Sequence, residues 1–272
     1  MFQRGQWAFY GMLMGMFCVN SAVWAQAPAA ENLKGSPAQA VLNDASAAGK
    51  FTFLVFYKDD HPAVRKMADI VKAGVQKRPD QTVAAFVQIT NPAEQPLVDR
   101  FQVARAAMPL TLTIAPNGAV TGIFSKEVTD ESMSESLVTP TMTRCMKSLQ
   151  ENRLVFVCVQ TGDQAAVPVG LKEMQADPQF KDRIVSVSMQ MRDPAETRFL
   201  NQMQIDPQAT TSPTTVLLAP PGVMIGKFDV NATGAQMAAA LHKAGKCCDD
   251  PNCKHNHGAS SQTTRPNSIR RK

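Results

Sequence analysis

The motif Asn91-Pro92-Ala93-Glu94 returns in the second half of the chain as Asp193-Pro194-Ala195-Glu196. In both copies Asn or Asp stands directly before a proline, where its side chain can cap a helix that has the proline in its first turn. Each copy follows an apolar, strand-like segment. The match indicates that the two halves of the chain contain the same structural unit.

Further matches lie downstream of both motifs. A lone proline, Pro109 or Pro213, opens a short β segment in each half. A glycine stands nine residues after each proline, at Gly118 and Gly222, in Asn-Gly and Pro-Gly pairs that are typical of hairpin turns. The two prolines are 104 residues apart, so the chain is predicted to hold an internal repeat. The hairpins also close in similar sequences, Gly122-Ile123-Phe124 and Gly226-Lys227-Phe228.

Apolar patterning supplies the remaining elements of each half. The first half predicts strands at 51–57, 82–89 and 110–115 and a helix at 62–76, and the second predicts strands at 154–159, 183–189 and 214–219 and a helix at 169–176. A last helix follows each hairpin, at 129–149 with a break at Pro140, and at 231–243. The order βαβαββα occurs twice, which predicts the α/β class with two tandem three-layer α/β sandwiches.

Each unit resembles a thioredoxin domain, and the resemblance covers residues 51–149 and 154–244. In the thioredoxin-like family, the proline before the hairpin strand is cis and faces the active site. The resemblance therefore implies a cis bond and a polypeptide-binding face at Met108-Pro109 and at Ser212-Pro213. A tandem of such domains is also similar to the non-catalytic modules of protein disulfide isomerases and to calsequestrin-type proteins.

The turn that follows the first strand of each unit departs from the family pattern. Thioredoxin chemistry needs Cys-x-x-Cys there, because the helix N-terminus lowers the pKa of the first thiol. The turns read Lys58-Asp-Asp-His-Pro-Ala63 and Thr161-Gly-Asp-Gln-Ala-Ala166, and neither contains cysteine. Both domains are therefore predicted to be redox-inactive, with no catalytic residue assigned in either.

The first of these turns carries Asp59, Asp60 and His61 near a helix N-terminus. Such a trio could bind a metal or act as acid and base. The favoured interpretation is a solvated helix cap, in which negative charge lies at the positive end of the helix dipole.

The N-terminal segment has the pattern of an export signal. Arg4 is the one charge before Glu31, an apolar run follows from Trp7 to Val19, and small residues lie around Ala25. The run is shorter than the roughly 18–20 residues of a spanning helix, so a signal peptide at 1–25 is favoured over an uncleaved anchor. We expect an exported protein, periplasmic or extracellular, that is not membrane-spanning after cleavage.

The C-terminal segment concentrates soft metal ligands. Three cysteines and two histidines fall within eleven residues: Cys247, Cys248, Cys253, His255 and His257. Thiolate and imidazole suit zinc or copper. The spacing matches no standard zinc module, so a local disulfide and a disordered Cys-rich tail stay open as alternatives.

Charge is unevenly placed along the 272 residues. The chain has 28 basic and 23 acidic residues, a net charge of +5. Seven basic residues lie outside the double domain: Arg4 and six residues beyond 244. Two acidic residues also lie beyond 244, so residues 26–244 hold 21 basic and 21 acidic residues. With aromatic residues at 6%, neither the charge nor the composition of this neutral body favours nucleic-acid binding.

The sequence thus predicts four segments: a signal peptide at 1–25, a thioredoxin-like domain at 26–150 with its core at 51–149, a second at 151–245, and a basic Cys/His tail at 246–272. The favoured function is that of a redox-inactive module or scaffold that binds a protein or peptide partner. One alternative is a zinc or copper carrier that uses the tail. Another is a thiol-disulfide oxidoreductase that uses the tail cysteines.

Overall fold

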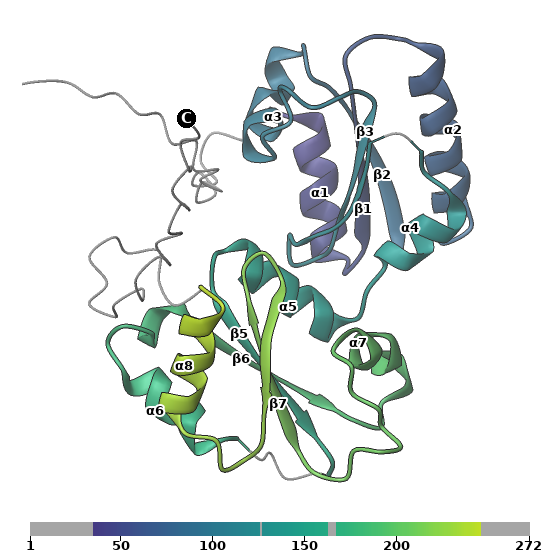
Figure 1. Cartoon of the computed structure of the whole chain (residues 1–272). Helices are drawn as coiled ribbons and strands as arrows, with labels where there is room; N and C mark the ends of the chain where they lie inside the picture. The colour runs from purple at the N-terminus through teal and green to yellow at the C-terminus, as the bar shows by residue number, and fades with distance from the viewer. Residues whose placement is uncertain (1–34, 126, 163–166, 246–272) are drawn as a thin grey trace, which may run out of the picture.

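The computed structural model describes residues 35–125, 127–162 and 167–245, which form two four-stranded sheets with helices on both sides of each (Figure 1). The predicted signal peptide and the predicted Cys/His tail lie outside the described residues. Within the described ranges, no helix combines the length and the apolar character needed to cross a membrane.

The first unit contains the first of the two sheets. Its strands are β1 (Phe51–Tyr57), β2 (Thr82–Gln88), β3 (Leu110–Ile114) and β4 (Val120–Phe124). Its helices are α1 (Pro37–Ala47), α2 (Pro62–Gln76), α3 (Gln95–Arg100) and α4 (Asp130–Ser136), and a 3-10 helix, η2 (Pro92–Glu94), precedes α3. The strand order is β2-β1-β3-β4, with β1 parallel to β2 and antiparallel to β3.

The second unit repeats this arrangement. Its strands are β5 (Leu154–Gln160), β6 (Ile184–Gln190), β7 (Thr214–Ala219) and β8 (Val223–Phe228). Its helices are α5 (Pro140–Gln150), α6 (Val169–Ala176), α7 (Thr197–Gln202) and α8 (Gly234–Lys243), with 3-10 helices η3 (Lys181–Arg183) and η4 (Pro194–Glu196). The strand order β6-β5-β7-β8 matches that of the first unit. The predicted α/β class and the thioredoxin-like fold of both units are confirmed.

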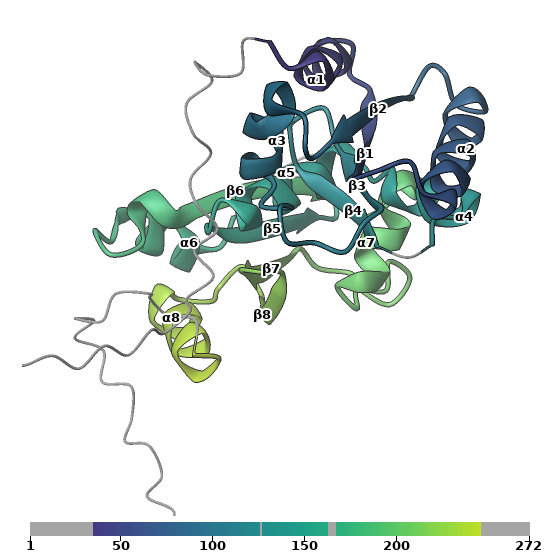
Figure 2. The ribbon, with the colours of Figure 1, turned by 90° about the horizontal axis from the view of Figure 1, so that it is seen from above.

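Helices cover both faces of each sheet. In the first unit, α1 and α3 pack on one face and α2 and α4 on the other, as two views show (Figures 1 and 2). In the second unit, α5 and α7 share one face and α6 and α8 the other. The central strands β1 and β5 therefore contact helices on both sides, which explains why both read as continuous apolar runs rather than as alternating sequences.

The position of α5 differs from the sequence-based expectation. The sequence predicted one broken helix at 129–149 that closes the first repeat, but the structure has two helices there. Thr139 caps α5 and Pro140 occupies its first turn, so a new helix begins at this point. Cys145 and Leu149 lie in the core of the second sheet, so α5 belongs to the second unit and not to the predicted first domain at 26–150.

Helix α1 takes the equivalent place in the first unit and was not predicted. The two helices are attached to their units in the same way. Ser36, the N-cap of α1, donates a hydrogen bond to the Glu94 carboxylate at 2.5 Å, and Thr139 donates to Glu196 at 2.8 Å. Both carboxylates are buried, 3% and 4% exposed. The glutamate of each Pro-Ala-Glu motif therefore fixes the first helix of its unit to the start of α3 or α7.

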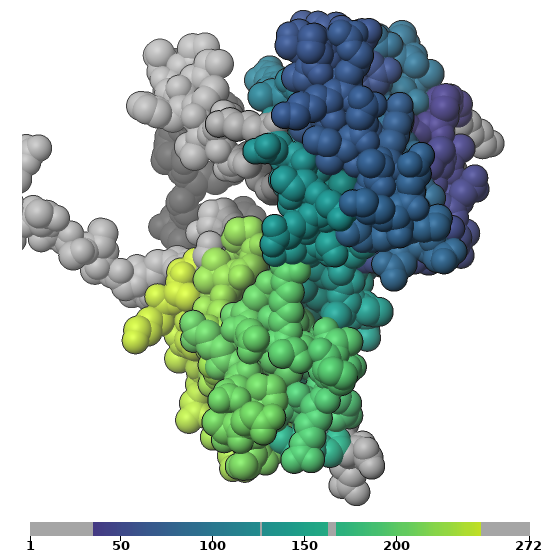
Figure 3. Space-filling model, turned by 90° about the vertical axis from the view of Figure 1, so that its right-hand side faces the viewer, coloured from purple at the N-terminus to yellow at the C-terminus, as the bar shows by residue number. Residues whose placement is uncertain are grey.

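The two units meet where α5 contacts the β3–β4 hairpin. The Gln150 side chain donates to the carbonyl oxygen of Val120 at 2.7 Å and accepts from the Val120 N–H at 3.0 Å. Asn117 donates to the carbonyl oxygen of Thr143 at 2.9 Å. This contact, called the seam below, joins the two lobes that the space-filling view shows one above the other (Figure 3). One face of α5 thus packs on the second sheet while another holds the first unit.

Candidate functional site

The predicted site residues of the first unit gather at one edge of its sheet. Phe56 in β1 pairs with Leu110 in β3, so Pro109 lies beside the end of β1, where the 58–61 turn begins. The Met108–Pro109 peptide bond is cis, as the resemblance implied. The topology therefore places this proline and the turn at the same edge, although their use as a binding face stays a prediction.

Within this turn, His61 is the N-cap of α2. Its Nδ1 accepts a hydrogen bond from the Ala63 N–H at 3.2 Å. Asp60 pairs with Arg65 at 2.8 Å in an exposed ion pair. The trio Asp59, Asp60 and His61 is exposed, and no described group of three or more His, Cys, Asp or Glu residues has the arrangement of a metal site. These contacts match the favoured helix-cap interpretation.

The equivalent edge of the second unit differs in its backbone. Val159 in β5 pairs with Thr214 in β7, which places Ser212–Pro213 next to the turn that starts at Thr161. Among the described residues the cis bonds are Met108–Pro109 and Pro220–Pro221, so the implied cis bond at Pro213 is wrong. The preference of X–Pro bonds for trans is small enough for packing to decide. Met108 packs against the first core, whereas Ser212 is exposed.

A polar hollow of about 780 Å³ opens at this edge of the second unit. Its walls come from the ends of β5 and β6, from the start of α7 and from the loop that leads into Ser212–Pro213. It lies outside the carboxyl ends of the two parallel strands, the usual place for ligands on open α/β sheets. The lining residues are Thr161, Met191, Arg192, Asp193, Pro194, Thr197, Pro207, Gln208, Thr210 and Thr211.

Sequence reasoning found Ser212 and Pro213 but missed this hollow. The residues of the 207–211 loop carry no periodic pattern, and their neighbours across the hollow are residues 191–197 and the more distant Thr161. The one available signal was the Asp193-Pro194 motif, which was assigned only to helix capping. Asp193 does cap η4, because its side chain accepts from the Ala195 N–H at 2.9 Å.

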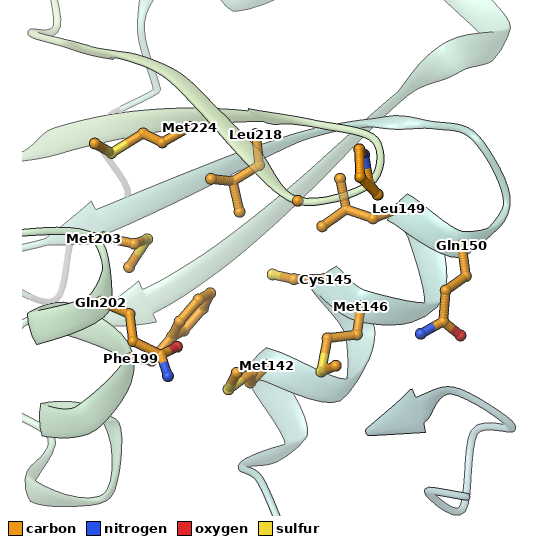
Figure 4. Close-up of a pocket in the computed structure, with 12 residues that line it drawn as sticks. Met142, Cys145, Met146, Leu149, Gln150, Phe199, Gln202, Met203, Leu218 and Met224 are labelled. Atoms are coloured by element: carbon orange, nitrogen blue, oxygen red, sulfur yellow. The ribbon is translucent and has the colours of Figure 1, made fainter. Parts of the chain in front are cut away.

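A second hollow, of about 240 Å³, is apolar and rich in sulfur. It lies between α5, α7 and the β7–β8 hairpin, and Cys145 points into it from α5 toward the side of Phe199 and Met203 (Figure 4). Four methionines line it, and these are Met142, Met146, Met203 and Met224. Such side chains suit adaptable apolar contact.

The two described thiols are poorly placed for redox chemistry. Cys145 is 1% exposed and Cys158 is fully buried in β5. Burial raises the pKa of the Cys145 thiol to about 12 and also raises the pKa of Cys158. The thiolate is the nucleophile in disulfide exchange, so neither side chain is activated for attack. The five predicted metal-ligating residues of the tail lie outside the described residues.

Comparison with known proteins returns solved structures but no sequence family. No family model matches the chain, and no curated protein sequence does. The N-terminal domain of an alkylhydroperoxide reductase AhpF from Enterococcus faecalis is 11% identical, with 75% of this chain and 98% of that chain covered and a TM-score of 0.29.

Two eukaryotic structures match to a similar degree. For the first two thioredoxin domains of Eps1p from Saccharomyces cerevisiae, identity is 11%, the coverages are 74% and 94%, and the TM-score is 0.29. For the zinc-bound form of human ERp44, identity is 10%, the coverages are 76% and 59%, and the TM-score is 0.32. At such scores the likeness carries no argument about function. The strand orders β2-β1-β3-β4 and β6-β5-β7-β8, with helices on both faces of each sheet, give the two units the same thioredoxin-like fold in tandem.

Proposed function

We propose that this protein is an exported binding module that holds an extended stretch of another polypeptide without thiol chemistry. The polar hollow beside Ser212–Pro213 is the observation that carries the proposal. It offers hydroxyl groups of Thr161, Thr210 and Thr211 next to the end of a sheet. Hydroxyls both donate and accept hydrogen bonds, which suits main-chain groups of varied sequence.

Absence of reactive thiols from this part of the molecule supports a binding role over an enzymatic one. None of the residues that line the hollow is cysteine. Cys145 and Cys158 are buried, and burial raises the pKa of both. A partner held there would be bound by hydrogen bonds and packing, and its covalent structure would be the same after release.

The test is the affinity of the purified protein for an unfolded, carboxymethylated polypeptide, measured by fluorescence anisotropy. Thr211 is exposed, so Thr211→Trp fills the hollow at little cost to the fold. We expect at least about tenfold weaker binding, equivalent to about 1.4 kcal/mol. Gln175→Trp, on the exposed side of α6, is the matched control and keeps the original affinity. Equal affinity in both variants would contradict the proposal.

The second candidate is zinc or copper binding by the tail, favoured by the clustering of Cys247, Cys248, Cys253, His255 and His257. Metal analysis with thiol counting on the purified protein tests it. Binding of about one metal ion that is lost when the three cysteines become serine supports a carrier function. Unchanged metal content in that variant excludes it. Insulin reduction by the tail thiols is the enzymatic alternative, and a cysteine-free tail is its control.

A further inference from the structure

Two cations from different units converge on the turn of the β3–β4 hairpin. Gly118 has φ of +80°, a backbone conformation that favours glycine. A β carbon built there would lie 3.6 Å from Nη2 of Arg100 and 4.0 Å from Nζ of Lys147, and, its chain neighbours aside, it would meet no other residue of the described ranges within 4 Å. An open point beside Gly118 therefore lies within about 4 Å of both cationic nitrogens.

The same point borders a hollow of about 380 Å³ in the first unit. Arg100 lines it, together with Lys50 and the polar side chains of Gln39, Asn43 and Asn117. No acidic residue is among those that line it. Volumes of about 300–1,000 Å³ are usual for small-molecule sites.

Neutralisation of these cations by the protein is incomplete. Arg100 forms no ion pair with any residue in the described ranges. Toward the residues that the structure describes, its guanidinium donates one long hydrogen bond, of 3.4 Å to the Gln39 side chain, and lies 5.1 Å from the Phe101 ring centre. Burial lowers the pKa of Arg100. Within the same ranges Lys147 has one carboxylate partner, Glu151 at 3.3 Å, and that pair is partly exposed.

The second unit provides an internal comparison. The last residue of α3 is Arg100, and the last residue of α7 is Gln202. Gly222 occupies the place of Gly118 in the β7–β8 turn, and a β carbon there would meet no described residue within 4 Å apart from its chain neighbours. The hollow beside it is the methionine-lined one. The cationic pair is thus a property of the first unit and the seam, and not of the repeated fold.

We propose that the seam binds the oxyanion group, a carboxylate or a phosphate, of a small ligand between Arg100, Lys147 and the Gly118 turn. A guanidinium matches the geometry of both groups and an ammonium adds a point charge. Because Arg100 belongs to the first unit and Lys147 to α5, the ligand would bridge the two units. This site lies at the end of β3 opposite Pro109 and is independent of the polypeptide-binding proposal.

The test is a titration of the purified ¹⁵N-labelled protein at constant ionic strength, with the Gly118 amide resonance as readout. Inorganic phosphate and succinate are the two probes, and whichever saturates identifies the anion class. We expect saturable shifts in the original protein and about tenfold weaker binding in Arg100→Gln and in Lys147→Gln. Lys66→Gln, an exposed lysine on α2, is the control and binds as before.

Folding of the test variants is checked by circular dichroism, and Gln is the residue that α7 itself carries at the place of Arg100. Lys147→Gln gives an independent result from the other unit. A shift that does not saturate with either probe would overturn the proposal. So would an affinity that is the same in Arg100→Gln as in the original protein.

Discussion

The β3–β4 and β7–β8 hairpins occupy the same place in two copies of one fold, yet their surroundings have opposite chemistry. The β3–β4 turn lies beside Arg100, Lys147 and amide side chains. The side chain of Gln150 in α5 accepts a hydrogen bond from the N–H of Val120, the first residue of β4. The second turn borders an apolar hollow with four methionines and a cysteine. Because the buried Glu–hydroxyl contact is common to both units, the internal frame is repeated while the surfaces differ. Function is therefore to be sought where the two units differ.

The outer helices of the two units also pack in different ways. In the first unit, Asp130 at the start of α4 pairs with Arg78 at 2.8 Å and Lys77 at 3.1 Å, just beyond α2. In the second unit, α6 and α8 approach so closely that Gly170 lies against the backbone of Thr233 and Gly234. Both units thus place a glycine at the contact of their outer helices, Gly74 against the Met133 side chain and Gly170 against backbone, and the first unit adds partly exposed ion pairs.

The largest effect is expected from Gly170→Ala. A β carbon there would overlap the backbone of Thr233 and Gly234, which no rotamer change can relieve. We expect a loss of about 3 kcal/mol in the free energy of unfolding, measured with urea. The matched control is Gly226→Ala, because a β carbon at Gly226 would meet only the tip of the Phe228 side chain, at 3.2 Å and 3.3 Å, and no backbone of the described residues. Equal stability of the two variants would show that α6 and α8 are not held by close backbone contact.

The next effect tests the frame that the units share. Glu94→Ala removes the acceptor of the Ser36 hydroxyl, and Glu196→Ala removes that of Thr139. Glu94→Ala leaves the buried Ser36 hydroxyl without this acceptor, and Glu196→Ala does the same to the half-buried Thr139 hydroxyl. Each variant should therefore lose about 1–2 kcal/mol of unfolding free energy, with the larger loss in Glu94→Ala. Exposed Glu135→Ala serves as the control. If only one of the two variants were destabilised, the equivalence of the α1 and α5 attachments would fail.

The smallest effect is a change in pH dependence in the first unit. Hydrogen bonds from Arg78 and Lys77 hold the pKa of Asp130 below its ordinary value. Because the folded pKa is depressed, this stabilisation is complete above the unfolded pKa and is lost as the pH falls through the folded pKa. In Asp130→Asn, the free energy of unfolding should therefore decrease less steeply than in the original protein as the pH falls below about 5. Unfolding curves at several pH values test this, with exposed Asp69→Asn as control.

Much of the fold could be predicted because apolar strands and proline-bounded turns leave direct signals in the sequence. The strand at 51–57 and the helix at 62–76 were predicted with the bounds that the structure has. Helix α1 was missed because its buried face is made largely of small residues such as Ala38 and Ala45. Its Ser36-Pro37 start nevertheless matches Thr139-Pro140, and that comparison would have found it.

The candidate sites were less predictable, because each joins residues that are distant in the sequence. The polar hollow combines Thr161 with the 207–211 loop, and the seam brings Arg100 to Lys147. Neither set has a spacing that a motif could reveal. The state of the bond before Pro213 was predicted wrongly, since family resemblance does not report the local packing around Ser212.

The most direct test of thiol-independent polypeptide binding is the affinity of a variant in which Cys247, Cys248 and Cys253 are serine. Cys145 and Cys158 are the cysteines of the described residues, and both are buried. With the three tail cysteines replaced, the variant has no accessible thiol in the described units or beyond Gly245. Anisotropy titration with the carboxymethylated polypeptide should give the affinity of the original protein. Loss of binding in the variant would contradict the account and assign the interaction to the tail cysteines.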